Sequence, residues 1–334
     1  MTTKLSIPPS GMEDDSLRNY LVEEFVEDYQ DGRITRREAL VKLASIFGSM
    51  AIATNFLAAC APALTATPVP PTATTAKPTT APTAASSSST SSAGAMSPLS
   101  VGADDPAIEA KMVDFKSGAD SIMAYMAKPK GDGPFPIVLV CHENRGLTDH
   151  IKDVTRRVAK AGYASLAVDL ISREGGTDKV GANAPGVLGN VPPQRFVDDF
   201  RAGLANMQGQ SFVRKDRAGM VGFCFGGGVT WLCAEGIADL KAVVPFYGPN
   251  PPLQDVSKIQ AAVLALYGAL DTRIDAGIPD IENAMKQNGK TYEKIIYPNA
   301  NHAFNNDTGA SYNADASNDA WAKTLAWFEK YLKS

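Results

Sequence analysis

The feature that most constrains this chain is the pentapeptide Gly222-Phe223-Cys224-Phe225-Gly226. It has the spacing of the G-x-S-x-G strand–turn–helix motif, with cysteine in place of the usual serine. Small residues on both sides allow a tight reversal around a central residue in a strained backbone conformation. The motif predicts a buried strand over 218–221 and a helix directly after Cys224. Taken alone, it suits a nucleophile and a small buried cysteine in a glycine-rich turn equally well.

Apolar runs that predict buried strands alternate with amphipathic runs that predict helices from about residue 101 to the end. Besides the strand before Cys224, we expect strands at 121–127, 135–141, 163–169, 242–247, 262–267 and 292–297. Helices are expected at 149–160, around Phe196 to Leu204, after Cys224, and at 317–332. This alternation predicts an α/β fold with a mostly parallel sheet of about seven to eight strands, helices on both faces and no large cap domain.

Two further residues follow Cys224 in the order that a catalytic triad requires. In sheets of this kind the nucleophile, an acid and a histidine succeed one another along the chain, each in a loop after a strand. Asp271 follows the strand at 262–267, and His302 follows the strand at 292–297. Either one alone could be an ordinary loop residue. Their joint order favours His302 as the base for the thiol and Asp271 as the group that orients the imidazole.

The acid and the oxyanion donors have further candidates. Asp275 and Asp169 are weaker choices for the acid, because Asp275 lies deeper in a helix start and Asp169 precedes the nucleophile. A tetrahedral intermediate needs two hydrogen-bond donors. We expect these to be the backbone N–H groups of Phe225, directly after the cysteine, and of Asn144, in the loop after the strand at 135–141.

As a set, these segments resemble the dienelactone hydrolase (carboxymethylenebutenolidase) family of the α/β-hydrolase superfamily. The resemblance spans about 112–332 and rests on His142-Glu143-Asn144-Arg145-Gly146, Ala161-Gly162-Tyr163-Ala164 with Val168-Asp169-Leu170, Gly222-Phe223-Cys224-Phe225-Gly226-Gly227, Gly268-Ala269-Leu270-Asp271, and Tyr297-Pro298-Asn299-Ala300-Asn301-His302-Ala303-Phe304. It implies that a cysteine attacks a lactone or ester carbonyl through a covalent acyl-enzyme. It also implies that Glu143 contacts the resting thiol and helps to control its ionisation.

One position departs from the family pattern. The resemblance implies two arginines that hold a substrate carboxylate, and one of them would lie four residues after His302, where this chain has Asn306. Arg173 and Arg195 are candidates for the second arginine, and Arg145 lies beside Glu143 in its loop. The expected substrate is therefore a small ester or lactone, with dienelactone itself left open.

The composition limits the classes of partner and ligand that we expect. A net charge of −4 argues against a nucleic-acid partner held by a basic face. The three histidines are dispersed, the four cysteines lack C-x-x-C spacing, and no cofactor motif is present, so we expect neither a metal site nor a cofactor. Cys141 and Cys233 are expected to be core residues.

Residues 1–60 have the pattern of an export signal. Arg36-Arg37 precede a moderately apolar run from Leu43 to Phe56, and the run ends in Leu57-Ala58-Ala59-Cys60. A twin arginine before such a run is typical of a Tat signal, and Leu-Ala-Ala-Cys resembles a lipobox. Cleavage before Cys60 and acylation of its thiol would follow, and the acidic stretch 14–31 would be an extended leader. An ordinary helix with a basic first turn is the alternative.

Residues 61–100 are almost entirely Pro, Thr, Ala and Ser, which predicts an extended tether. The sequence thus predicts an export signal at 1–60, a tether at 61–100 and a catalytic domain at 101–334, anchored by lipid on the outer side of the cytoplasmic membrane. Two alternatives to a hydrolase are a non-catalytic, lipid-anchored binding module on the same scaffold and an acyl transferase.

Overall fold

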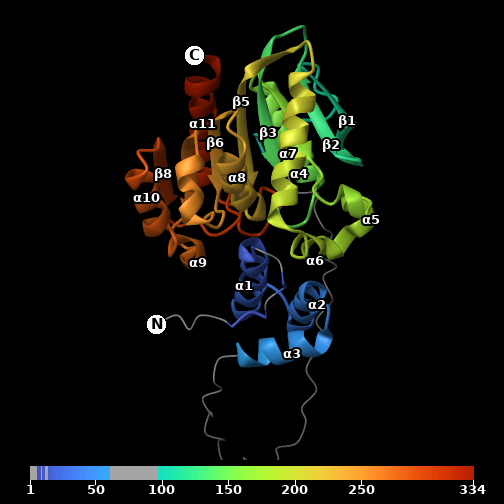
Figure 1. Ribbon diagram of the computed structural model, residues 1–334, viewed down its shortest axis with the longest axis vertical. Helices are drawn as coiled ribbons and strands as arrows, with labels where there is room; N and C mark the ends of the chain where they lie inside the picture. The colour runs from blue at the N-terminus through green and yellow to red at the C-terminus, as the bar shows by residue number, and fades with distance from the viewer. Residues whose placement is uncertain (1–5, 9, 12–13, 61–96) are drawn as a thin grey trace, which may run out of the picture.

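A computed structural model describes residues 6–8, 10–11, 14–60 and 97–334. Most of the tether predicted at 61–100 lies outside these residues. The described part contains a twisted sheet with helices packed along it, and three N-terminal helices lie across one end of this sheet (Figure 1).

The sheet has eight strands, in the order β1-β2-β4-β3-β5-β6-β7-β8. The strands are β1 (Ile108–Ser117), β2 (Asp120–Pro129), β3 (Phe135–Cys141), β4 (Ala164–Val168), β5 (Val213–Phe223), β6 (Leu240–Phe246), β7 (Ala262–Gly268) and β8 (Tyr292–Tyr297). The β1–β2 and β2–β4 pairs are antiparallel, and all the other pairs are parallel. The predicted mostly parallel sheet is therefore confirmed. Sequence analysis missed β1, an edge strand in which only three of ten residues are buried.

Helices cover both faces of the sheet. The longer ones are α4 (Asp149–Lys160), α7 (Pro193–Gln208), α8 (Phe225–Gly236), α10 (Ile278–Gln287) and α11 (Ala314–Phe328), and the shorter ones are α5 (Thr177–Val180), α6 (Ala184–Leu188) and α9 (Thr272–Asp275). On β5, Gly219 faces Phe328 of α11, whereas Gly222 faces Thr230 of α8. Because residues three apart on a strand point to opposite faces, α11 and α8 lie on opposite sides of the sheet.

The central strands are apolar along nearly their whole length. Every residue of β4 and β7 is buried, as expected for parallel strands covered on both faces. Cys141 and Cys233 have no exposed surface and belong to this core.

The three N-terminal helices are α1 (Ser16–Gln30), α2 (Arg36–Phe47) and α3 (Met50–Ala59). A capping box between Thr35 and Glu38 begins α2, and Gly48, with a left-handed φ of 70°, ends it. Apolar side chains of all three helices are buried in the same core as the sheet. In Figure 1 these helices (blue) lie below the sheet, where α1 packs against α8 and α2 packs against α6. None of the helices in the described residues has both the length and the apolar character that crossing a membrane requires.

Candidate active site

Cys224 stands at the turn between β5 and α8, in a strained conformation with φ 58° and ψ −122°. The neighbouring glycines are required by space. A Cβ on Gly222 would lie 2.2 Å from the Gly226 carbonyl oxygen, and one on Gly226 would lie 2.3 Å from the His142 carbonyl oxygen. The Cys224 N–H donates to the Phe246 carbonyl over 3.1 Å, which ties the turn to the adjacent strand. The thiol is therefore held at the carboxyl edge of the sheet, next to the start of α8.

Asp271 and His302 reach the same edge from the ends of β7 and β8. His302 Nδ1 and Asp271 Oδ2 are 2.5 Å apart, and both side chains are buried. His302 also offers a ring nitrogen within 4.8 Å of the Cys224 thiol. Asp271 caps α9 as well, since its Oδ1 accepts from the Ile274 N–H. The structure thus brings the three predicted residues together in the order thiol, imidazole, carboxylate.

The two alternative acids serve other purposes. Asp169 accepts hydrogen bonds from the backbone N–H and the hydroxyl of Thr177. Asp275 ends α9, where burial and the charge of Asp271 raise its pKa to about 6. Asp271 is therefore the acid that contacts His302.

Charges in the site favour an ionised Asp271 and a protonated thiol. Burial works against the Asp271 carboxylate, but the charge and hydrogen bond of His302 outweigh it and lower the pKa of Asp271. Burial likewise opposes protonation of His302, yet the Asp271 carboxylate and the Cys224 thiolate raise its pKa well above the usual value, so the imidazole can hold the proton that the thiol gives up. Burial and then the charge of Glu24 raise the pKa of Cys224. A proton must leave this thiol before it can attack a carbonyl.

Helix α1 supplies two side chains to the thiol that sequence analysis missed. The Tyr20 hydroxyl lies 3.1 Å from Cys224 Sγ and 3.2 Å from His302 Nε2. Both carboxylate oxygens of Glu24 lie 3.7 Å from the same sulfur. A signal for this packing is present in the sequence, since Leu17, Leu21 and Phe25 recur every four residues and all three are buried.

Of the two residues expected to donate to an oxyanion, Phe225 follows Cys224 directly and Asn144 lines the same cavity as Cys224. Phe225 is the first residue of α8, where backbone N–H groups have no partner within the helix. Asn144 lies in the loop after β3, and its side-chain amide donates to Glu24 Oε1 over 2.9 Å. Glu24 therefore bridges the thiol and the loop that carries Asn144.

Glu143 is buried and accepts a hydrogen bond from the Asn306 amide over 2.7 Å. Burial raises the pKa of Glu143, and its charge adds to the rise in the pKa of Cys224. Asn306, at the position expected for a family arginine, thus contacts a carboxylate of the protein itself.

The three arginines considered for substrate binding differ in their surroundings. Arg173 pairs with Asp199, with Nη1 and Oδ2 2.5 Å apart. Arg195 binds both carboxylate oxygens of Glu174 at 2.9 Å. Arg145 is exposed and borders the cavity beside Cys224. Of these three, Arg145 is the one placed to meet a ligand there.

A cavity of about 750 Å³ opens beside the thiol. One wall comes from α1 and α2, through Glu24, Phe25, Asp28 and Lys42. The opposite wall comes from loops of the sheet, through Glu143, Asn144, Arg145, Cys224, His302 and Asn306. The volume suits a small molecule.

Glu24, Cys224 and His302 each offer a metal-ligating atom, and these atoms lie within 4.8 Å of one another. Carboxylate, thiolate and imidazole are ligands that Zn²⁺ accepts. The Tyr20 hydroxyl already contacts two of the three residues, and His302 is bound to Asp271 through its other nitrogen. This pattern equally fits a hydrogen-bonded thiol–imidazole pair.

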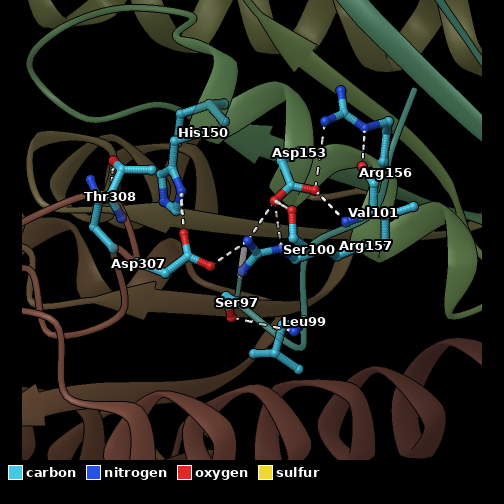
Figure 2. A network of polar contacts seen from close by, with 12 residues as sticks. Ser97, Leu99, Ser100, Val101, His150, Asp153, Arg156, Arg157, Asp307 and Thr308 are labelled. Atoms are coloured by element: carbon cyan, nitrogen blue, oxygen red, sulfur yellow. Dashed lines mark hydrogen bonds and ion pairs between the residues drawn. The ribbon is translucent and has the colours of Figure 1, made fainter. Parts of the chain in front are cut away.

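A buried ion-pair network fixes the loop that follows His302 (Figure 2). Arg157 of α4 contacts Asp307 and Asp153 at 2.5 Å each, and His150 Nδ1 lies 3.1 Å from Asp307 Oδ1. Asp153 also accepts from the Ser100 hydroxyl and the Val101 N–H. The network therefore ties the residues around 100 to α4 and to the loop that carries Asn306.

Comparison with known proteins gives consistent results. The family model described as "Dienelactone hydrolase family" matches residues 122–332. A Methylorubrum extorquens protein named "Putative carboxymethylenebutenolidase" is 37% identical over 224 residues, which cover 63% of this chain and 77% of that protein. A protein of the same name from Escherichia coli K12 is 35% identical over 243 residues, covering 68% of this chain and 89% of that protein.

Solved structures that resemble this chain also include dienelactone hydrolases. A crystal structure titled as a putative dienelactone hydrolase from Klebsiella pneumoniae matches with a TM-score of 0.64 and 33% identity, covering 67% of this chain and 100% of that chain. A dienelactone hydrolase-like promiscuous phosphotriesterase from metagenomic libraries matches with a TM-score of 0.60 and 27% identity, covering 67% and 99%.

Proposed function

Because the chain belongs to the dienelactone hydrolase family, a family of hydrolases acting on lactones and esters, we propose that Cys224 is the nucleophile of a cofactor-free hydrolysis through an acyl-enzyme. The observation that carries this proposal is the buried chain of contacts from Asp271 through His302 to the thiol, with 2.5 Å between the carboxylate and the imidazole.

The proposed acylation begins with proton transfer from the Cys224 thiol to His302 Nε2. The thiolate then attacks the substrate carbonyl, and the N–H groups of Phe225 and Asn144 bind the oxyanion. His302 returns its proton to the leaving oxygen as the carbon–oxygen bond breaks. Asp271 keeps the imidazole oriented and stabilises its protonated form.

Deacylation reverses these roles. Water takes the place of the departed alcohol or enol, His302 removes a proton from it, and the resulting hydroxide attacks the thioester carbon. The tetrahedral intermediate then expels the Cys224 thiolate, which regains its proton. Each proton transfer uses a group within the buried chain of contacts, and no step requires a cofactor.

The proposal is tested with the full chain and with Cys224→Ala on p-nitrophenyl acetate and a small enol-lactone. We expect turnover to fall by roughly 10³-fold or more in Cys224→Ala, because covalent catalysis is lost. Cys233→Ala is the matched control, since its thiol is buried in the core away from the site. Retained turnover in Cys224→Ala would remove Cys224 as the nucleophile. Added acceptor alcohol separates hydrolysis from acyl transfer.

We also propose that residues 1–60 act as a Tat-type export signal with acylation of Cys60, leaving the enzyme lipid-anchored in the cell envelope. Arg36-Arg37 and Leu57-Ala58-Ala59-Cys60 support it. Cys60 lies at the end of α3, where it is half-buried against the edge of the core. Cys60→Ser should move the protein from the membrane fraction to the soluble fraction, and unchanged fractionation would refute lipidation.

A further inference from the structure

One face of α1 is directed at the catalytic residues. Tyr20, Glu24 and Glu27 stand four and three residues apart, which places them on the same side of a helix. Tyr20 contacts Cys224 and His302, and Glu24 contacts the thiol. Glu27 Oε2 accepts from the Arg273 Nε over 2.8 Å. A helix from the N-terminal segment thus fills space at the nucleophile.

The Tyr20 hydroxyl occupies a chemically defined position. In acyl transfer, the leaving oxygen must lie near the attacking sulfur and within hydrogen-bond reach of the imidazole that protonates it. The Tyr20 oxygen satisfies both conditions, at 3.1 Å from Cys224 Sγ and 3.2 Å from His302 Nε2. The ring attached to this oxygen therefore occupies the space that the remainder of a leaving group would take.

The surroundings of that ring favour an aromatic group. The Arg273 guanidinium carbon lies 4.7 Å from the centre of the Tyr20 ring, a cation–π distance. Arg273 is largely buried and belongs to α9, the helix that Asp271 caps, so it is part of the sheet-end segment that carries the triad and not of α1. The catalytic domain thus carries its own cation against this space.

Thiol chemistry points to the same class of leaving group. A tetrahedral intermediate on sulfur expels the better leaving group, and a free thiol has a pKa of about 8.5 against about 10 for a phenol. Aryloxide therefore competes with thiolate in departure even before it is fully protonated, whereas the oxygen of a simple alcohol, a much weaker acid, needs the whole proton from His302 to leave.

We infer that α1 is a built-in occupant of the substrate site and that Tyr20 fills a subsite for an aromatic leaving group lined by Arg273. The substrate class is an aryl ester, and this inference rests on the proposed function. In the step concerned, a bond forms between Sγ and the acyl carbon while the bond from that carbon to the aryl oxygen breaks. The thiol proton passes through His302 to that oxygen, so the products are a thioester and a phenol.

The proposed cleavage before Cys60 adds a consequence. It would separate residues 1–59, which contain all three N-terminal helices, from the catalytic domain. Departure of α1 would remove Tyr20 and Glu24 from the thiol and free Arg273 from Glu27. The uncleaved chain would then be the less active form.

The test compares the full-length wild type with full-length Tyr20→Ala on phenyl acetate and ethyl acetate. We expect Tyr20→Ala to raise kcat/KM for phenyl acetate by about tenfold or more, because the competent site is no longer filled. Adding Arg273→Gln should lower the preference for phenyl over ethyl acetate by about tenfold, through loss of the cation–π contact. Val41→Ala, at an exposed position of α2, is the matched control and should behave as wild type.

A second variant guards against misfolding of the first. Glu27→Gln breaks the α1–Arg273 ion pair at a partly exposed position and should also raise turnover. Thermal melting reports whether each variant is folded. A folded Tyr20→Ala with turnover equal to or below wild type would overturn the inference, as would an unchanged ester preference after Arg273→Gln.

Alkylation of Cys224 by iodoacetamide tests the aromatic subsite independently of the proposed reaction. In Tyr20→Ala, phenol should protect Cys224 from iodoacetamide, and it should not do so in the wild type, where Tyr20 fills the subsite. Protection without turnover of any ester would support the subsite and reject the proposed reaction. Turnover that depends on Cys224 without protection by phenol would do the opposite.

Discussion

Two walls enclose the Cys224 thiol, and they differ in origin and in charge. One is built by loops at the carboxyl end of the sheet. These loops carry His302, which has a ring nitrogen near the sulfur, and Asp271, which contacts His302. The other is α1, which brings the neutral Tyr20 hydroxyl and the Glu24 carboxylate. His302 of the first wall lowers the pKa of Cys224 and so favours ionisation of the thiol, whereas Glu24 of the second wall raises that pKa. Reactivity therefore depends on whether α1 is in place.

The largest effect is expected within the first wall. Asp271→Asn should lower turnover by roughly 10³- to 10⁴-fold, because the imidazole loses the partner that fixes its tautomer. The measurement is kcat/KM on p-nitrophenyl acetate. Asp275→Asn, four residues further on and at the end of α9, is the matched control and should retain most activity. If the control variant were the more damaged of the two, the acid would have been misassigned.

The second largest effect is expected in the ion-pair network that supports the first wall. Arg157→Met leaves Asp307 and Asp153 buried without their shared partner, which should lower the free energy of unfolding by about 3 kcal/mol. Urea denaturation measures this change. Arg201→Met, which breaks an exposed pair with Asp198, should cost well under about 1 kcal/mol. Equal losses in the two variants would contradict a structural role for the network in Figure 2.

A substitution in the second wall should raise the reactivity of the thiol instead of lowering turnover. Glu24→Gln removes a negative charge beside the thiol, so the raised pKa of Cys224 should fall. Thiolate forms as pH rises, and the profile of iodoacetamide reaction against pH should therefore shift to lower pH. At neutral pH the rate should therefore increase, because a larger fraction of the thiol is ionised. Glu109→Gln, exposed on β1, should leave the profile unchanged. A shift to higher pH would mean that Glu24 assists ionisation.

The smallest effect is expected where the walls of the cavity meet the loop after His302. Asn306→Ala removes the hydrogen bond to the buried Glu143 carboxylate, at a cost of about 1–3 kcal/mol for an unsatisfied buried group. Turnover should fall only a few-fold, because no proton transfer passes through this pair. Asn288→Ala, which breaks a hydrogen bond at an exposed helix end, is the control. A loss as large as that of Asp271→Asn would place Asn306 among the groups that contact substrate.

Much of the first wall could be predicted from sequence, because the topology of the sheet fixes which loops meet at its carboxyl edge. Parallel strands bring their carboxyl ends to one edge, so Cys224, Asp271 and His302 follow from chain order once the strands are identified. The glycines around Cys224 carry a local signal, since a Cβ at Gly222 or Gly226 would strike the backbone.

The second wall could not be predicted in the same way. The sequence of the acidic stretch 14–31 is typical of an extended leader. Its helix is stabilised by packing of Leu17, Leu21 and Phe25 against a distant part of the chain. The partner of Glu143 was hidden for a similar reason. Its contact with Asn306 spans 163 residues and depends on how the Asp307 ion pairs hold that loop.

The most direct test of the central claim is mass spectrometry of the full chain quenched during turnover of p-nitrophenyl acetate. The account predicts one acetyl group on the peptide that contains Cys224, a larger labelled fraction in Tyr20→Ala, and no label together with lost turnover in Cys224→Ala. An acetyl group on another residue with turnover retained in Cys224→Ala would contradict it.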